Sequence, residues 1–301
     1  MLGERATAES LEKLRHELGL DKPLHIQYGL YMQRVVKFDL GRSIKTGQKV
    51  SEEIKDHLPA TAELAIWAMF FSTGVGIVLG VLSATRKNSW IDFSSMAGAL
   101  VGVSMPVFWL ALVFIMIFSV ALDLFPTGGR MNIRYYFTSM SGLYVLDGII
   151  MLFKNGDPKV FLSALHHLVL PAIALGTIPL AIIARITRSS MLEVLNQDYI
   201  KTARSAGIKE RRVIYRYALK NALLPIITVI GLQFGMLFAG AILTETVFSW
   251  PGIGKWLYHA IESRDYPAVQ GGIIFISTTF VLINLVVDIL YSVVNPKIRL
   301  S

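Results

Sequence analysis

Long apolar runs separated by short charged segments dominate the chain. Five runs contain no Asp, Glu, Lys or Arg: Ala65–Ala84, Phe93–Leu122, Val160–Ala184, Asn221–Thr244 and Tyr266–Val287. Each is long enough for an α-helix that crosses a bilayer, which needs roughly 20 apolar residues. The apolar residues are continuous rather than alternating, which disfavours the strands of a membrane β-barrel. The pattern predicts an all-α, polytopic membrane protein with five transmembrane helices.

A sixth apolar run, Ser141–Phe153, is shorter and is interrupted by Asp147 and Gly148. We expect an interfacial or re-entrant piece there. Small residues recur four positions apart in three of the long runs, as at Ser72 and Gly76, which favours close packing of helices in lipid. Four prolines near or inside the runs favour kinks, because proline removes a backbone hydrogen bond: Pro106, Pro171, Pro179 and Pro225.

The overall composition agrees with a membrane protein. Of the 301 residues, 53% are hydrophobic and 17% are charged, and the mean hydropathy is +0.54. An average soluble domain carries roughly 25% charged residues. We interpret the net charge of +8 as the bias of basic residues towards the cytoplasmic side, and not as a nucleic-acid surface. The chain has no cysteine, which excludes a disulfide framework, thiolate catalysis, iron–sulfur clusters and cysteine zinc sites.

Basic residues predict which side of the membrane each loop faces. The segment Arg185–Lys220 carries nine Lys and Arg against three Asp and Glu, so its net charge is 9 − 3 = +6. By the positive-inside rule this segment faces the cytoplasm. The basic residues at 86–87, two spans earlier, and in the tail at 297–299, two spans later, then fall on the same side. The C-terminus is therefore expected inside, and the loops 123–159 and 245–265 outside.

With five spans and an inside C-terminus, the first 60 residues must lie outside. They carry ten Lys and Arg and nine Asp and Glu, with no apolar segment ahead of them to take them across. We therefore expect a further transmembrane helix ahead of Met1; the alternative is a protein with its N-terminus outside. The expected organisation is an extracytoplasmic N-terminal segment, 1–60, and a transmembrane domain, 61–301, with a cytoplasmic loop at 185–221. The N-terminal segment is expected to hold two helices and a turn: Ala8–Leu18, Tyr28–Phe38, and Gly41 to Gly47.

Two motifs suggest chemistry that their neighbours do not support. His166 and His167 are adjacent, so their side chains diverge by about 100° on a helix, and we expect no metal site there. The run 252–255, Gly-Ile-Gly-Lys, resembles the end of a phosphate-binding loop. Trp256 stands where such a loop needs Ser or Thr, so we do not expect nucleotide binding.

Two acidic residues are kept as candidate structural or gating residues. Asp288 is an ionisable residue in an apolar helix, and its place near the cytoplasmic end of the last run favours an interfacial structural contact. Glu245 directly follows the fourth run. The spans hold no ladder of carboxylates, which argues against a proton-driven mechanism.

The most informative segment is the basic loop. Asp198 can cap a short helix through Ala206, and Gly207 can end that helix in a left-handed conformation. A second helix is expected through Ala222, with Val213 among its apolar positions. Two short helices joined by a glycine elbow would form a rigid projection, which a membrane protein needs in order to receive motion from a soluble partner.

The spacing Thr202-Ala203-x-x-x-Gly207, followed after nine residues by Tyr217-Ala218-Leu219-Lys220, is similar to the EAA loop of binding-protein-dependent ABC importers. That loop has the pattern Glu-Ala-Ala, three residues, Gly, nine residues, then Ile-x-Leu-Pro. The alanine, glycine and leucine positions match. The departures are Lys201, Thr202, Tyr217 and Lys220, and they resemble the B-type permease subunit of dipeptide, oligopeptide and nickel importers. Three further stretches are similar to that branch: Leu14–Pro23, Leu58–Glu63 and Glu245–Asp265.

The resemblance covers nearly the whole chain and implies a type I ABC importer transmembrane domain. This subunit and a second, C-type permease subunit would form the pathway, two cytoplasmic ATPases would drive it, and an extracytoplasmic binding protein would deliver substrate. The residues that would form the ATPase-coupling loop are Thr202, Ala203, Gly207, Tyr217 and Leu219. The chain would be a non-catalytic, multi-pass subunit in a bacterial or archaeal inner membrane, surrounded by lipid. It would bind no ATP, cofactor, metal or nucleic acid itself.

The residues alone leave one alternative function open. An ion-coupled secondary transporter would need coupling carboxylates within its spans or an internal repeat, and Asp288 alone is thin support. A membrane hydrolase would need a nucleophile beside a base, and no such pair stands out. The substrate also stays open between dipeptides, oligopeptides, nickel and other solutes, because the spans hold few fixed charges that could grip peptide termini.

Overall fold

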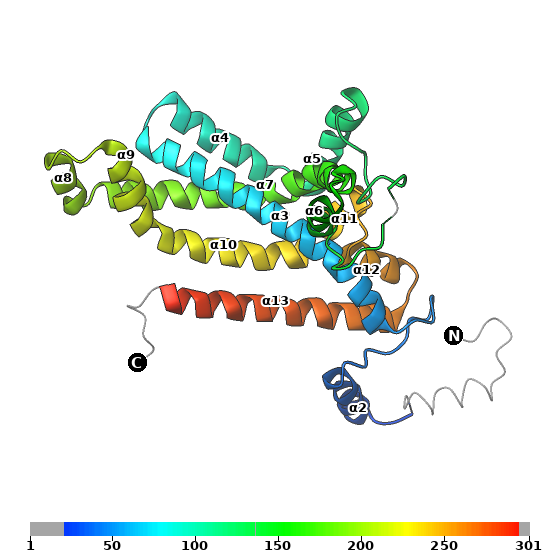
Figure 1. Cartoon of the computed structure of the whole chain (residues 1–301). Coiled ribbons are helices and arrows are strands. Elements are labelled where there is room, and N and C mark those ends of the chain that lie inside the picture. The colour runs from blue at the N-terminus through cyan, green and yellow to red at the C-terminus, as the bar shows by residue number, and fades with distance from the viewer. Residues whose placement is uncertain (1–20, 136, 295–301) are drawn as a thin grey trace. The chain divides into compact units, whose positions relative to one another are not determined.

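The computed structural model describes residues 21–135 and 137–294, and this part of the chain is helical (Figure 1). The longest helices are α3 (Val50–Thr85), α4 (Trp90–Ser104), α7 (Lys159–Leu195), α10 (Lys220–Gly240) and α13 (Tyr266–Val294). The shorter elements are α2 (Leu24–Val36), α5 (Val107–Phe114), α6 (Tyr144–Asn155), α8 (Asp198–Ser205), α9 (Glu210–Arg212), α11 (Ile242–Val247), α12 (Ile253–Glu262) and two π-helices, η1 (Ile115–Ala121) and η2 (Val213–Leu219). Within the two described ranges the backbone forms no strand, only an isolated bridge. The predicted all-α class is confirmed.

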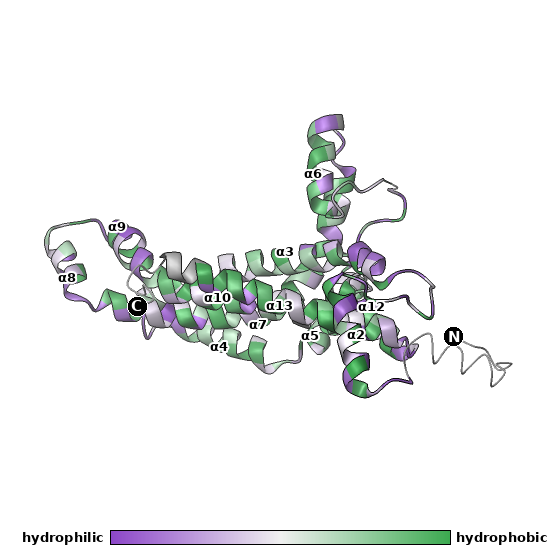
Figure 2. Ribbon diagram, turned by 90° about the horizontal axis from the view of Figure 1, so that it is seen from below, coloured by the Kyte–Doolittle hydropathy of each residue, from purple (hydrophilic) through white to green (hydrophobic). Residues whose placement is uncertain are grey.

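Four helical segments are long and apolar enough to cross a membrane: Val50–Thr85, Lys159–Leu195, Glu210–Phe238 and Tyr266–Ile289. A bent pair of helices, Trp90–Ser104 and Val107–Ala121, makes a fifth span if the pair is counted as one. These segments contain the five apolar runs of the sequence almost entirely. Figure 2 shows the apolar stretches along α4, α7 and α10.

The run Phe93–Leu122 differs most from the prediction. It forms α4 as far as Ser104 and α5 from Val107, and the two helices are bent by 106°. Between them, Met105 has extended backbone (φ −93°, ψ 134°), and Pro106 precedes α5 with φ −59°. Proline has no N–H to continue a helix and disfavours helical geometry in the residue before it. The kink expected at Pro106 is therefore a complete break.

α7 is the central helix of the compact unit formed by residues 57–256 with the chain from 276 onwards. It packs against α4, α5, α6 and α10, and Figure 1 shows α4 and α10 running alongside it. Its buried side chains include Leu168, Ile183 and Met191. The helix continues through Pro171 and Pro179 without ending.

Small residues bring α3 and α7 into close contact. The Ser72 hydroxyl donates a hydrogen bond to the carbonyl of Gly176 at 2.7 Å. A Cβ atom at Gly80 would stand 2.5 Å from the Thr187 side chain, and one at Gly76 would stand 3.0 Å from its nearest neighbours in α7. The four-residue spacing of small residues thus serves helix packing, as predicted.

A second compact unit contains the chain up to Asp56 together with Leu257–Phe275. Within it, Asp265 accepts hydrogen bonds from the Ser43 hydroxyl at 2.5 Å and from the backbone N–H of Lys45 at 3.1 Å. Burial raises the pKa of the Asp265 carboxyl, but the hydrogen bonds outweigh it and hold that pKa below its usual value. The unit is therefore held together by a charged carboxylate.

The predicted turn in the N-terminal segment is confirmed. Gly41 and Gly47 have φ of +85° and +73°. An isolated antiparallel bridge pairs Arg42 with Lys49, just before α3 begins. The predicted helix at 28–38 corresponds to α2, which begins and ends slightly earlier. The helix predicted at Ala8–Leu18 and the basic tail at 297–299 lie outside the described residues.

Two other apolar runs form helices whose bounds differ from those of the runs. The short run Ser141–Phe153 forms α6, a separate helix that ends at a left-handed Gly156 (φ +70°). The run Asn221–Thr244 forms α10 and then, after Ala241, the short helix α11. The predicted domain boundary at residue 60 falls inside α3 and stays a prediction.

Candidate functional site

The loop predicted to couple to a soluble partner was 185–221, but residues 185–195 belong to α7. The part beyond α7 that carries the motif comprises residues 198–220, here called the coupling segment. α7 ends at Leu195 and α8 begins at Asp198, so the segment follows the central helix almost directly. α9 and η2 then continue into α10 without interruption. Figures 1 and 2 show α8 projecting beyond the ends of α4 and α10. The second helix of the segment is therefore the beginning of the next span, and not a separate helix that ends at Ala222.

The elbow between α8 and α9 is a complete C-terminal helix cap. The N–H of Gly207 donates to the carbonyl of Arg204 at 2.9 Å, and the N–H of Ile208 donates to the carbonyl of Ala203 at 3.2 Å. These two hydrogen bonds form a Schellman motif, in which glycine commonly takes the left-handed conformation. Gly207 has φ +75°. The left-handed end predicted for α8 at Gly207 is confirmed.

The prediction that Asp198 caps α8 is wrong. Asp198 is the first residue of the helix, and the N-cap position belongs to Gln197 (φ −70°, ψ 150°), which makes no capping hydrogen bond through its side chain. The Asp198 carboxylate instead accepts a hydrogen bond from Lys201 Nζ at 2.8 Å. In the first turn of a helix this carboxylate still interacts favourably with the helix dipole.

Buried apolar side chains fix α8 against the following helix. Ile200 and Ala203 of α8 are buried, as are Val213 and Ala218 of η2. All four belong to the main hydrophobic core, which continues into α3, α7 and α10. Because apolar burial is the main source of stability, α8 is part of the folded core and not a loosely attached loop.

The five residues of the predicted coupling motif divide into two groups. Ala203 is buried, and Tyr217 and Leu219 pack against the core with part of their surface exposed. Thr202 and Gly207 are exposed. The first group builds the shape of the segment, and the second stands at its surface.

An ion pair that sequence reasoning missed joins α4 to α7 at the same end of the bundle. Nε and Nη2 of Arg188 donate to the two carboxylate oxygens of Asp92, at 2.6 and 2.7 Å. The Ser83 hydroxyl donates to the same carboxylate. The side chain of Asp92 is 7% exposed and that of Arg188 is 27% exposed. The available signal was that both are ionisable residues at the ends of apolar runs.

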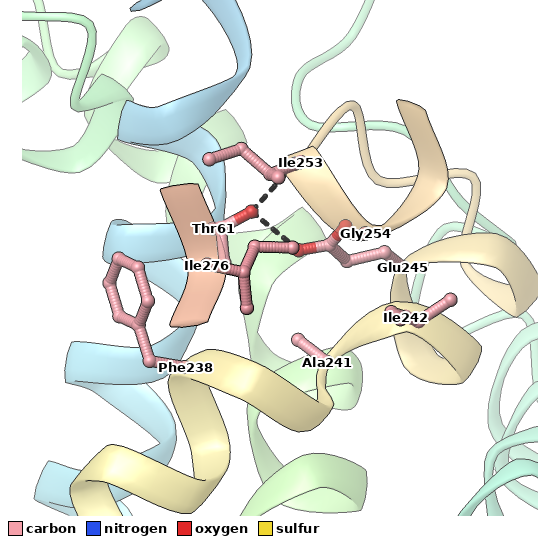
Figure 3. A pocket seen from close by; sticks show the side chains of 8 residues that line it. All are labelled: Thr61, Phe238, Ala241, Ile242, Glu245, Ile253, Gly254 and Ile276. Atoms are coloured by element: carbon pink, nitrogen blue, oxygen red, sulfur yellow. Dashed lines mark hydrogen bonds between the residues drawn. The ribbon is translucent and has the colours of Figure 1, made fainter. Parts of the chain in front are cut away.

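At the opposite end of the bundle, the side chain of Glu245 is completely buried (Figure 3). Its Oε1 accepts a hydrogen bond from the Thr61 hydroxyl at 2.6 Å, and its Oε2 accepts one from the N–H of Lys255 at 2.9 Å. The Thr61 oxygen also accepts the N–H of Ile253 at 2.8 Å. Burial raises the pKa of the Glu245 carboxyl above its usual value, and the hydrogen bonds from Thr61, Lys255 and Gly254 oppose that rise. Glu245 thus fastens α3, α11 and the first turn of α12 to one another.

Two glycines make room for this carboxylate. A Cβ atom at Gly252 would overlap the Glu245 carboxylate, and one at Gly254 would stand 2.8 Å from Glu245 Oε2 and 2.7 Å from the Cα of Ile242. The cavity beside Glu245 measures about 10 Å³, which is room for about one water molecule. The Gly-Ile-Gly sequence therefore serves close packing around a carboxylate.

A second buried carboxylate lies at this end, and it was not predicted. Oε2 of Glu63 accepts hydrogen bonds from Nε and Nη2 of Arg130 at 3.0 and 2.6 Å, and its Oε1 accepts the N–H of Val145 at 2.7 Å. The Arg130 guanidinium also lies 3.9 Å from the centre of the Tyr144 ring. The side chains of Glu63 and Arg130 are only 2% and 8% exposed. This pair attaches the start of α6 and the loop before it to α3.

Asp147 organises the turn that begins α6. Its carboxylate accepts hydrogen bonds from the hydroxyls of Ser139 and Ser141, at 2.5 and 2.6 Å, and from the N–H of Met140 at 3.0 Å. Burial raises the pKa of the Asp147 carboxyl, but the hydrogen bonds outweigh it and hold that pKa below its usual value. The polar interruption in the short apolar run therefore fixes the beginning of a helix.

The remaining candidates do not converge on a site. Asp288 is exposed on α13. The rings of His166 and His167 each lie within hydrogen-bonding distance of a backbone carbonyl, at 2.6 and 2.8 Å. In the described ranges, no three His, Asp or Glu side chains are grouped so that they could hold a metal ion.

Comparisons with known proteins place this architecture in a family. The model of the binding-protein-dependent transport system inner membrane component matches residues 76–300. The model of the N-terminal part of such membrane components matches residues 1–65. Together the two models account for nearly the whole chain.

Several curated relatives share about half of their residues with this chain. A dipeptide transport system permease protein of Alkalihalophilus pseudofirmus is 52% identical over 299 residues, which cover 99% of this chain and 89% of the relative. The dipeptide transport system permease protein of Escherichia coli strain K12 is 50% identical over 303 residues, with 99% and 88% covered. A di/tripeptide transport system permease protein of Pseudomonas aeruginosa is 48% identical over 300 residues, again with 99% and 88% covered.

The fold is also similar to two solved structures. One is the MetNI methionine ABC transporter in an inward-facing conformation, with a TM-score of 0.57 and 16% identity over 79% of this chain and 93% of that chain. The other is an amino acid ABC transporter with histidines, with a TM-score of 0.55 and 14% identity over 82% and 95%. At such low identity these structures show the shared fold alone. With the family match and the close relatives, the chain belongs to the binding-protein-dependent transport system inner membrane components, as a membrane-integral B-type permease subunit of an ABC importer.

Proposed function

We propose that this permease subunit carries dipeptides or short oligopeptides in an ATP-driven importer. It forms the translocation pathway together with a C-type permease subunit. Two cytoplasmic ATPase subunits bind and hydrolyse the ATP, and an extracytoplasmic binding protein delivers the peptide. The complex lies in the plasma membrane of a bacterium or archaeon, with the coupling segment and the C-terminus on the cytoplasmic side.

The structure of the coupling segment is the observation that carries this proposal. A permease that hydrolyses no ATP needs a firm surface through which a partner can move its helices. The segment projects from the bundle, is fixed by the Schellman motif and by buried Ile200 and Ala203, and is continuous with α10. In this proposal Thr202 and Gly207 lie at the ATPase contact, whereas Ala203, Tyr217 and Leu219 maintain the shape of the segment.

The relatives support a peptide as the substrate. The three relatives above are named as permeases for dipeptides or for di- and tripeptides, which favours peptides over nickel. The buried carboxylates of Glu63 and Glu245 are each engaged by hydrogen bonds within the chain. Neither is free to bind a peptide amine or a coupling ion, which also disfavours the alternative of an ion-coupled secondary transporter. We assign Glu245 a structural role, and Asp288 a contact with a neighbouring subunit, because it is an exposed acid on an apolar helix.

Uptake of a labelled dipeptide by proteoliposomes tests this function. The chain is co-expressed with the C-type permease and both ATPases, and the purified complex is reconstituted with ATP on the ATPase side and the binding protein on the other. Uptake is expected only when ATP and the binding protein are both present. The matched control is a complex whose ATPase subunits are catalytically inactive. Uptake that continues without ATP and follows an ion gradient would overturn the proposal in favour of the secondary transporter.

Exchange of the binding protein tests where selectivity lies. A binding protein of different preference that still docks on this permease is expected to change the imported peptide accordingly. If the imported peptide stays the same, a selective site lies within these helices.

A further inference from the structure

The surface of the coupling segment carries five cations that have no acidic partner among the residues that the structure describes. Their side chains are exposed, and no Asp or Glu of the described residues lies within 4.0 Å of their charged groups. They are Lys209, Arg211, Arg212, Arg216 and Lys220. We call these five residues the basic face.

Both acidic side chains of the segment form ion pairs within the segment itself. Asp198 pairs with Lys201 at 2.8 Å, and Glu210 pairs with Arg204 at 2.7 Å. Residues 198–220 contain seven Lys and Arg against two Asp and Glu, so the net charge is 7 − 2 = +5. After both internal pairs are formed, all five excess charges belong to the basic face. That face is therefore complementary to a surface of opposite sign.

The helix that carries the basic face is amphipathic, and its two sides have different tasks. Val213 and Ala218 are buried against α8. Arg212 and Arg216 are four residues apart and exposed, so they share a side of the helix. Tyr215 beside them is 55% exposed. Arginine and tyrosine are the residues that contribute most at protein interfaces, and arginine binds carboxylates in a planar, two-pronged geometry.

The sequence of the segment shows the same preference for an acidic partner. The EAA pattern begins with glutamate, and this chain has Lys201 at that position, which reverses the charge. The Lys201 side chain is 67% exposed, and an exposed ion pair such as the one with Asp198 contributes little and exchanges easily. A partner that meets this position therefore meets a cation where the pattern has an anion.

We propose that the basic face binds an acidic patch on a cytoplasmic ATPase subunit, and that this charge complementarity holds the ATPase on the coupling segment. The inference rests on the proposed function and adds the chemistry of the partner surface. A protein is favoured over anionic lipid as the occupant, because the basic face follows α8, which projects beyond the ends of α4 and α10, and it presents an exposed tyrosine among its arginines.

Charge reversal in the assembled complex tests this inference. The variant Arg211→Glu/Arg212→Glu changes two exposed residues of α9, and Arg86→Glu/Lys87→Glu changes an equally exposed basic pair between α3 and α4. Each permease is tagged, co-expressed with the C-type permease and the ATPases, and purified at several NaCl concentrations. Wild type is expected to retain less ATPase as salt increases. The first variant is expected to retain about ten-fold less ATPase than wild type at low salt, because like charges would then face each other across the interface. The control is expected to match wild type.

Co-purification of the C-type permease shows that each variant is folded and assembled. If charge reversal prevents assembly, Arg211→Gln/Arg212→Gln is used, with a smaller loss of ATPase in the same direction. Unchanged ATPase retention in the variants overturns the inference and leaves the proposed function intact. An equal loss in the Arg86→Glu/Lys87→Glu control also overturns it, because the effect would then be a general one of charge. Normal ATPase retention together with a new dependence of uptake on phosphatidylglycerol in the vesicles would assign the basic face to lipid. Failure of wild type to retain any ATPase would overturn the proposed function itself.

Discussion

The end of the bundle with α6 and α11 and the surface of the coupling segment use charge in opposite ways. At the end with α6 and α11, the carboxylates of Glu63, Glu245 and Asp147 are buried and each is held by several hydrogen bonds. In the coupling segment, most charges are exposed cations, and the Arg204–Glu210 pair is 44% and 55% exposed. Buried carboxyl groups that are hydrogen-bonded within the chain hold neighbouring elements together. Exposed charges without internal partners are available to other molecules.

The clearest way to break this comparison is to remove one charge from a buried pair. Glu63→Ala leaves the Arg130 guanidinium buried without its partner, and we expect a loss of about 3–5 kcal/mol in stability. Thermal unfolding of the purified protein in detergent measures it. The matched control is Glu210→Ala in the exposed pair, for which at most about 1 kcal/mol is expected. Equal losses would show that the end with α6 and α11 and the coupling segment do not differ in this way.

A change in packing around the second buried carboxylate is expected to have the next largest effect. In Gly252→Ala the new methyl group overlaps the Glu245 carboxylate, and forced overpacking of this kind costs about 1–3 kcal/mol. Gly74→Ala in α3 is the control, because a Cβ atom there meets no atom within 4 Å. The two midpoints of thermal unfolding are compared. A stable Gly252→Ala protein would mean that the glycine is not required by this contact.

Substitutions at Gly207, in the elbow of the coupling segment, distinguish an effect on stability from an effect on the coupling of ATP hydrolysis to transport. Gly207 has φ +75°, but a Cβ atom there has open space within 4 Å. Within the chain, Gly207→Val therefore adds only backbone strain, about 1–2 kcal/mol; the new side chain also lies at the surface proposed for the ATPase. We expect more ATP hydrolysed per peptide imported, with membrane insertion unchanged. Gly207→Asn, which tolerates the left-handed conformation better, is expected to stay near wild type; the same defect in both variants would point to a cause other than strain.

The smallest expected effect is a change with pH in the stability that the Asp147 carboxylate contributes. The pKa of the Asp147 carboxyl is lower in the folded protein than in the unfolded chain, so its charged form stabilises the fold. This stabilisation is present above the unfolded pKa of about 4 and is lost as the pH falls through the folded pKa. Asp147→Asn is thus expected to lower the unfolding temperature at neutral pH, and the difference from wild type should shrink below about pH 4. A constant difference across this range would contradict the assignment.

Long apolar segments were predictable from the sequence because the bilayer imposes one strong requirement, an uncharged run of sufficient length. The break at Pro106 was predictable as a disturbance, but its angle of 106° depends on what α5 packs against, including α7 and α11. The glycine elbow was predictable because helix caps are local in sequence. The loop as a whole is less separate than expected, since its second helix continues into α10.

The contacts that fasten the bundle could not be paired from the sequence. Asp92 and Arg188 are 96 positions apart, and Thr61 and Glu245 are 184 positions apart. Helical periodicity gives the face on which a residue lies, but not which distant residue it meets. For the same reason the motif showed that Ala203 and Thr202 belong together, but the structure was needed to show that one is buried and the other exposed.

The length of α7 determines how far a displacement of α8 can be transmitted along the bundle. Its 37 residues span about 55 Å at 1.5 Å per residue, which exceeds the thickness of the hydrocarbon layer, roughly 30 Å. Only Asn196 and Gln197 separate its end from α8. A connection this short has almost no slack, so a push on α8 is delivered to α7 before the linker can absorb it. If a few flexible residues were inserted at this junction, the partner would still dock, but the flexible linker would absorb the displacement of α8 and α7 would not move.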